Sequence, residues 1–89
     1  MDRAEIFAVL KKNMTEIIGG ARGREILETH RLLQDFDADS LEVVEVISRT
    51  MKQVKIKVSR VRLNEANHIG DLLDMFVAAQ EAGATPAAR

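Results

Sequence analysis

The chain has 89 residues and no cysteine, and hydrophobic residues make up 46% of it. This length fits one domain with one modest core, and the hydrophobic share excludes a disordered chain. The lack of cysteine excludes disulfides, thiolate metal sites and cysteine nucleophiles, so any thiol chemistry must arrive on a cofactor.

Charge is unevenly distributed along the chain, although the net charge is only −1. Residues 1–48 hold six basic and ten acidic residues, whereas residues 49–62, here called the basic strip, hold six basic residues and no acid. The strip is solvated surface, a docking patch for a partner or a nucleic-acid site. Nucleic acid is the least favoured of the three, because the strip has no aromatic residue to stack on bases.

A first helix is predicted over residues 2–18, because apolar side chains recur at spacings of three and four: Phe7, Leu10, Met14 and Ile17. Asp2, followed three residues later by Glu5, has the pattern of a capping box. Gly19 and Gly20 are expected to end this helix in the left-handed conformation that glycine readily takes.

A long irregular segment is predicted over residues 21–39, with a short helical turn near residues 25–28. Loops of this length are uncommon in compact domains and are often functional. Its apolar residues are expected to fix it to the core: Ile26, Leu27, Leu32, Leu33 and Phe36.

A second helix is predicted from Asp39 or Ser40 to about Val54, followed by an exit segment over residues 55–58. The apolar positions recur at helical spacing: Leu41, Val44, Ile47, Met51 and Val54. Leu41 and Val44 are therefore expected to point into the core.

Residues 61–66 can form only a short helix or turn. A last helix is predicted over residues 69–82, capped by Asn67 or His68 and ended by Gly83, and residues 84–89 are predicted to be a flexible tail. The predicted fold class is all-α, a small antiparallel bundle of three main helices plus one short helix. No apolar run is long enough to span a membrane and no secretory leader opens the chain, so a cytoplasmic protein is expected.

Ser40 lies where the long loop meets the second helix. A helix start offers free backbone N–H groups and the positive end of the helix dipole, so a phosphate esterified to this serine would be well placed. Glu42 and Glu45 lie on the exposed side of the same helix and could meet a basic patch on a partner. Taken on its own, the position of Ser40 favours an ordinary helix cap over a modification site. His30 and His68 lack suitably spaced partners, so no metal site is expected.

The motif Asp39-Ser40-Leu41, followed by Glu45, resembles the Asp-Ser-Leu signature of the acyl carrier protein family. The order of helix, long loop, signature helix, short element and last helix resembles the family over residues 1–83. The last helix is also similar, in His68-Ile69-Gly70-Asp71-Leu72.

The resemblance implies that Ser40 takes a 4′-phosphopantetheine group from coenzyme A through a phosphopantetheinyl transferase. The thiol of that group would hold acyl intermediates as thioesters and present them to acyltransferase or ketosynthase-type enzymes. The chain itself would be a monomeric carrier and no enzyme. Candidates to line a groove for the acyl chain are Leu41, Phe36, Val44 and Ile69.

Two departures from the family pattern bear on the pathway. Asp37 stands where the family often has glycine, and aspartate tolerates turn geometry well. The basic strip stands where fatty-acid carriers are usually acidic, and residues 58–63 look like those of stand-alone polyketide carriers, among them acetyl donors for β-branching. Arg60 and Arg62 are candidate docking residues. The alternatives are a fatty-acid carrier, an aminoacyl or peptidyl carrier, and an unmodified helical interaction module.

Overall fold

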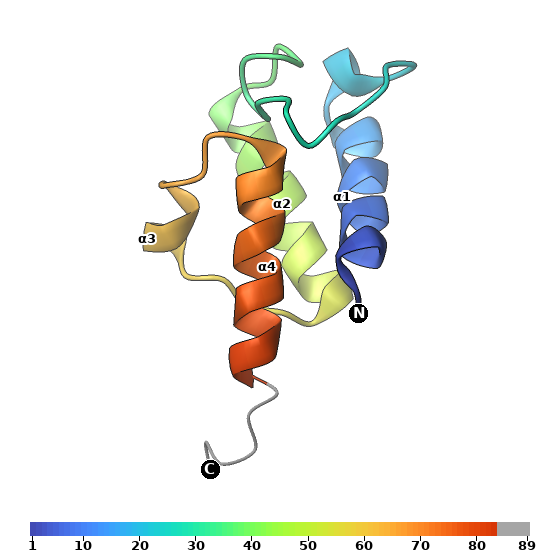
Figure 1. The fold of residues 1–89 in the computed structure, drawn as a ribbon. Helices are drawn as coiled ribbons and strands as arrows, with labels where there is room; N and C mark the ends of the chain where they lie inside the picture. The colour runs from blue at the N-terminus through green and yellow to red at the C-terminus, as the bar shows by residue number, and fades with distance from the viewer. Residues whose placement is uncertain (84–89) are drawn as a thin grey trace.

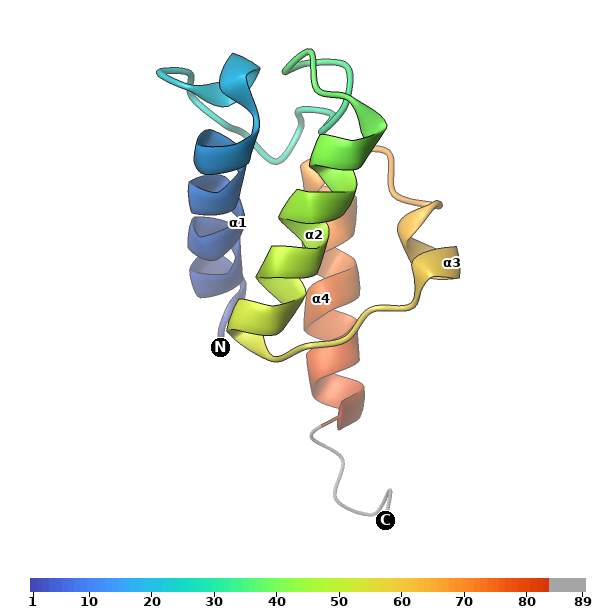
Figure 2. The same cartoon turned by 180° about the vertical axis from the view of Figure 1, so that it is seen from behind.

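The computed structural model describes residues 1–83, and the predicted tail 84–89 lies outside them. The described part contains four α-helices and one 3-10 turn, in this order: α1 Arg3–Ile17, η1 Gly19–Ala21, α2 Ser40–Val54, α3 Arg60–Leu63 and α4 Ile69–Gly83. The long helices lie side by side, with α2 and α4 running opposite to α1 and α3 set to one side (Figures 1 and 2). No strand occurs in this part of the chain, so the predicted small helical bundle is confirmed.

The core lies between the three long helices and is almost wholly aliphatic. Two phenylalanines, Phe36 from the loop and Phe76 from α4, are fully buried in it. The other fully buried apolar side chains come mainly from α1 and α4: Ile6, Leu10, Met14, Ile18, Val46, Ile69 and Leu73. On α1, Phe7 and Ile17 are only half-buried, because the helix is rotated so that Ile6 faces the core.

Both ends of α1 have a clear local cause. The Asp2 carboxylate accepts a hydrogen bond from the Glu5 backbone, and the Glu5 side chain accepts one from the Asp2 backbone, so the predicted capping box is confirmed. The expected left-handed glycine is wrong, because neither Gly19 nor Gly20 has a positive φ. Gly20 is needed for space: a Cβ there would lie 2.0 Å from the Phe36 carbonyl oxygen.

The core face of α2 differs from the prediction. Leu41 is 81% exposed and Val44 is 48% exposed, so neither points into the core. A polar contact sets the helix rotation, because the buried Asn13 Nδ2 of α1 donates to the buried Thr50 Oγ1 at 2.9 Å. With Thr50 and Val46 facing α1, the side of α2 that carries Leu41 and Val44 is turned outward.

The loop over residues 22–39 is fixed at its middle to the start of α4. The amide N–H of Gly70 donates to the Glu28 carbonyl at 2.8 Å, and that of Ile69 donates to the His30 carbonyl at 2.9 Å. No helical turn forms at residues 25–28; the short turn lies instead at η1. Among the predicted anchors, Leu27 and Leu33 are 43% and 39% exposed. The loop therefore crosses the end of the bundle where α2 begins.

Candidate functional site

Ser40 is the first residue of α2, and the cap of this helix is Asp39. The Asp39 carboxylate accepts from the Glu42 amide at 2.8 Å, and the Glu42 carboxylate accepts from the Asp39 amide at 3.0 Å. Since Asp39 takes the capping role, the Ser40 hydroxyl is not needed for it. Ser40 is exposed, and no hydrogen bond joins its hydroxyl to another residue in the described part of the chain.

The first turn of α2 favours a negatively charged substituent on the Ser40 oxygen. The first turn of a helix leaves backbone N–H groups without helical partners and carries the positive end of the helix dipole. Only the Glu42 N–H is occupied by the Asp39 side chain here. An exposed serine hydroxyl beside such donors can carry a phosphate ester.

The turn that leads into Ser40 depends on an unusual backbone conformation at Asp37. Its φ is 53°, in the left-handed region that glycine prefers and that aspartate tolerates better than most residues. The Ala38 amide then donates to the Leu33 carbonyl at 3.0 Å and closes the turn. The prediction that Asp37 can occupy a glycine-type turn position is confirmed.

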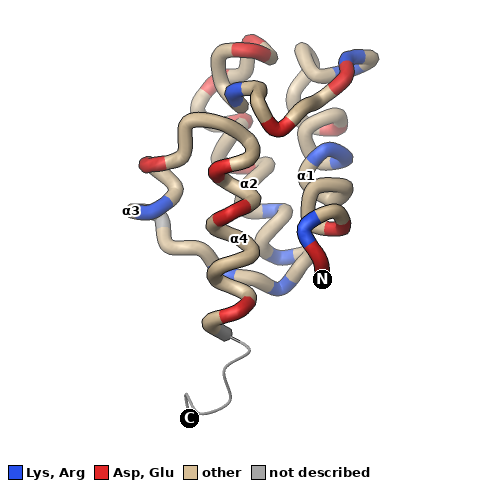
Figure 3. The backbone as a smooth tube through the Cα atoms, viewed as in Figure 1, with Lys and Arg blue, Asp and Glu red and all other residues tan. Residues whose placement is uncertain are grey.

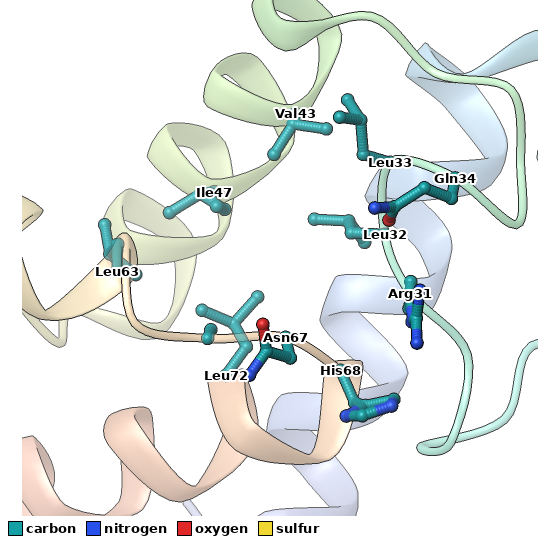
Figure 4. Close-up of a pocket in the computed structure, with 11 residues that line it drawn as sticks. Arg31, Leu32, Leu33, Gln34, Val43, Ile47, Leu63, Asn67, His68 and Leu72 are labelled. Atoms are coloured by element: carbon teal, nitrogen blue, oxygen red, sulfur yellow. The ribbon is translucent and has the colours of Figure 1, made fainter.

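A hollow of about 470 Å³ lies beside the start of α2 (Figure 4). Val43 and Ile47, which line it, follow Ser40 by three and seven residues and so share its side of the helix. The remaining walls come from the loop, α3 and the start of α4: Arg31, Leu32, Leu33, Gln34, Leu63, Ala66, Asn67, His68 and Leu72. The hollow is thus aliphatic along α2, with polar side chains from the loop and from the start of α4.

A second hollow of about 420 Å³ lies between α2 and α3. It shares Val43, Ile47 and Leu63 with the hollow beside Ser40. Its other lining residues are Val44, Ser48, Met51, Val58 and Asn64. The two hollows therefore form a surface with an aliphatic floor that runs from the Ser40 end of α2 toward α3.

The candidate groove residues are only partly at this surface. Val44 lines the second hollow, but Phe36 and Ile69 are fully buried and line neither one. Phe36 belongs to the hydrophobic core, and the His30 ring meets it edge-on at 5.1 Å between centroids. The groove assignment of Phe36 and Ile69 is therefore corrected to a core role. Val43 and Ile47 can be identified as lining residues from their helical spacing after Ser40. Nothing in the sequence around Leu63 indicates that it lines the same hollow.

The predicted docking residues lie on separate elements. The Glu42 side chain is half-buried in the α2 cap, while the Glu45 side chain is 60% exposed and 3.5 Å from Arg49. Arg49 also binds Glu16 of α1 at 3.0 Å. Arg62 is exposed on α3, and Arg60 begins that helix, with its side chain outside the described part. Among the described side chains, no ion pair joins Glu42 or Glu45 to Arg62.

At the start of α4, the Asp71 carboxylate accepts hydrogen bonds from the backbone that precedes the helix. Asp71 Oδ2 accepts from the backbone amides of Asn67 at 3.0 Å and His68 at 3.1 Å. These two hydrogen bonds lower the pKa of the Asp71 carboxyl, since they stabilise its ionised form. They also fix the backbone at one wall of the hollow beside Ser40, to which Asn67 and His68 belong.

Comparison with known proteins gives a consistent family, although no family model matches the chain. A polyketide biosynthesis acyl-carrier-protein, AcpK, from Bacillus subtilis is 29% identical over 85% of this chain and 92% of its own length. An acyl carrier protein from Saccharopolyspora erythraea is 29% identical over 84% of this chain and 78% of its own length. An acyl carrier protein from Thermotoga maritima is 28% identical over 80% of this chain and 86% of its own length.

These similarities span most of the helical bundle, and they agree with the Asp-Ser-Leu motif at the start of α2 and with the all-helical fold. Proteins of this kind are carriers rather than enzymes, and they generally bear a phosphopantetheine group. Together, the sequence similarities and the all-helical fold support an acyl carrier protein.

Proposed function

We propose that Ser40 is the attachment point of a 4′-phosphopantetheine arm, on which this chain carries acyl groups. The observation that carries the proposal is that Asp39, and not Ser40, caps α2. Asp39 caps the helix, and the neighbouring serine is left exposed at a site that favours a phosphate. A serine that served only as a helix cap would have its hydroxyl on a backbone amide.

The residues around Ser40 fit such an arm. Free backbone N–H groups of the first turn of α2 would hold its phosphate, and the aliphatic side of α2 at Val43 and Ile47 would shelter its length and the acyl chain. Leu63 of α3 closes the opposite wall. The terminal thiol of the group supplies a thioester linkage to the acyl chain.

Partner enzymes would meet the carrier at the exposed part of α2. Leu41 and Val44, three residues apart on one side of the helix, present apolar surface next to Ser40, and Glu45 adds a negative charge. We propose that a phosphopantetheinyl transferase and acyltransferase or ketosynthase-type enzymes dock here, with Glu42, Arg60 and Arg62 as further contacts. Exposed apolar side chains of this size mark contact sites when they cluster.

The pathway we propose is polyketide biosynthesis in the cytoplasm, including the supply of acetyl units for β-branching. Similarity to a relative named for polyketide biosynthesis supports it, and so does the basic character of residues 49–62. A fatty-acid carrier is the competing assignment, since the other two relatives are named simply acyl carrier protein.

Intact-mass spectrometry tests the carrier proposal. The purified chain is incubated with coenzyme A and a broad-specificity phosphopantetheinyl transferase. The proposal predicts a mass gain of one phosphopantetheinyl group, absent in Ser40→Ala and retained in Ser48→Ala, the matched control within α2. An unchanged mass for the wild-type chain, or the same gain in Ser40→Ala, would contradict it.

A further inference from the structure

A cationic surface lies at the end of α2 opposite to Ser40. Lys52, Lys55 and Lys57, here called the lysine patch, are all exposed, and Figure 3 shows basic residues where α2 ends and the chain turns toward α3. A hollow of about 430 Å³ is lined by these three lysines together with Ser48, Met51 and Ile56. A neighbouring hollow of about 270 Å³ shares Lys57 and includes Arg62. The surface therefore combines four cations with an aliphatic floor.

The backbone at the end of α2 places Lys55 and Lys57 on the surface. Lys55 ends α2 in the left-handed conformation, with φ 59°, and its amide donates to the Met51 carbonyl. Burial alternates along the chain that follows, with Ile56 and Val58 buried at 6% and 7% exposure and Lys57 between them exposed. Lys57 therefore faces away from the core.

The lysine patch has no internal counter-charge. Arg49, one turn earlier on α2, is bound by Glu16 and Glu45. Within residues 1–83, no salt bridge involves the three lysines or Arg62, and no acid lines either of the two hollows. The dipole of α2 favours Lys52 and Lys55 at its C-terminal end, but its effect fades within one turn and does not explain Lys57 or Arg62. Uncompensated like charges on one surface favour an acidic partner.

We infer that the lysine patch docks an acidic segment of a partner protein, with carboxylates on the three lysines and a small apolar side chain over Met51 and Ile56. Charge complementarity selects this occupant. The aliphatic floor suits a protein side chain, and none of the described residues that line the two hollows is aromatic, as base stacking would require.

The position of the patch adds a geometric requirement, which rests on the proposed function. Lys55 lies 15 residues after Ser40, which at about 1.5 Å per helical residue separates them by roughly 22 Å. An enzyme that acts on an acyl group attached at Ser40 would then place its acidic contact about 20 Å from the opening of its active site.

The test uses a synthetic peptide, Glu-Glu-Leu-Glu-Glu-Leu-Glu-Glu, titrated into the full chain at low ionic strength and followed by backbone amide NMR shifts. We expect the largest shifts at residues 52–58 and at Arg62. Lys57→Glu should weaken binding about fivefold, and Lys57→Arg should bind like the wild type. Lys12→Glu on α1, an exposed lysine with the same charge change, should weaken binding less than about twofold.

Three outcomes would overturn the inference: equal weakening by Lys57→Glu and Lys12→Glu, shifts spread over all the lysines, or tighter binding of a single-stranded oligothymidylate than of the peptide. Circular dichroism of each variant checks that the helices remain. Ser40→Ala should bind the peptide as the wild type does. Because peptide binding needs no arm, failure of arm attachment and failure of docking give different results.

Discussion

At the scale of single residues, the site depends on two neighbouring side chains with different tasks. Asp39 closes the α2 capping box with Glu42, and Ser40 remains exposed beside it. Two residues earlier, Asp37 holds a left-handed conformation that lets the loop turn into the helix. A carboxylate cap satisfies backbone donors more strongly than a hydroxyl does, which is why the serine is free for another role.

The capping assignment predicts unequal costs for two alanine substitutions. Asp39→Ala should lower the free energy of unfolding by about 1 kcal/mol, because it removes the cap. Ser40→Ala should change it by less than about 0.5 kcal/mol, since an exposed position at a helix start tolerates alanine. Urea unfolding measures both. A larger loss from Ser40→Ala than from Asp39→Ala would mean that the serine is the true cap.

Because Asp37 has a positive φ, the free energy of unfolding should depend on the shape of the side chain at position 37. Asp37→Gly should leave the free energy of unfolding within about 0.5 kcal/mol of wild type, because relief of strain offsets the added chain entropy. Asp37→Val should lose about 1–2 kcal/mol, since a β-branched residue resists the left-handed conformation. Thermal unfolding of the pair checks this, and equal stability of the two variants would count against the turn geometry.

Asp71 predicts a pH dependence of stability. Its pKa is lowered in the folded chain by hydrogen bonds from the Asn67 and His68 amides. Its contribution to stability is therefore complete above the unfolded value of about 4, and it is lost as the pH falls through the folded pKa. Wild type should exceed Asp71→Asn in stability at pH 7, and the gap should narrow below about pH 4. A gap that stays constant down to acid unfolding would contradict this.

At the scale of elements, the long loop is held closely against the bundle. Backbone carbonyls of residues 28 and 30 accept from the first amides of α4, and Arg3 of α1 binds Glu28 at 2.7 Å and also Asp74 of α4. Glu28 and Asp74 stabilise the guanidinium and raise the pKa of Arg3 above its usual value. At the other end of the loop, the Phe36 backbone lies against Gly20. The loop can therefore present Ser40 from a fixed position.

Gly19 and Gly20 provide a matched test of this close approach. Gly20→Ala should lose at least about 2 kcal/mol, because the new Cβ would meet the Phe36 carbonyl oxygen and the loop would have to move. Gly19→Ala should be within about 0.5 kcal/mol of wild type, as nothing lies within 4 Å of a Cβ there. Calorimetric melting separates the two, and similar melting temperatures for both variants would disprove the contact.

The helices can be predicted from the sequence, but the side of α2 that faces the core cannot. Apolar spacing, the Asp2 cap and the position of Gly83 define the helices locally. The rotation of α2 depends on Asn13 and Thr50, polar residues that hydrophobic periodicity assigns to the surface. Periodicity alone also assigns Leu41 and Val44 to the core, whereas both are exposed. The hollow beside Ser40 depends on Leu32 and Leu63, which only the tertiary fold brings together.

At the scale of the whole molecule, α2 joins two kinds of surface. Its start presents Ser40, the exposed apolar residues Leu41 and Val44, and the hollow beside them. Its end presents the lysine patch. Figure 3 shows acidic residues in the loop before α2 and basic residues at the end of α2. Within residues 1–83, no helix has the length and apolar character needed to cross a membrane.

Because the two ends of α2 present different surfaces, we predict that a partner enzyme docks on the chain in one orientation. An enzyme that recognises both ends should lose transfer rate on Lys57→Glu, with the effect shrinking as added salt screens the charges. Lys12→Glu should leave the rate nearly unchanged. Acyl-transfer rates at two salt concentrations test this with the enzyme that loads or unloads the chain. Equal slowing by both variants would indicate a general charge effect.

The central claim is that Ser40 carries the arm, and fragmentation mass spectrometry of the modified chain tests it most directly. After incubation with coenzyme A and a phosphopantetheinyl transferase, the protein is digested and each fragment that bears the added mass is sequenced. We predict that the added group lies on Ser40 alone. Attachment at Ser48 or Ser59, or an unmodified fragment that contains Ser40 at full conversion, would contradict the account.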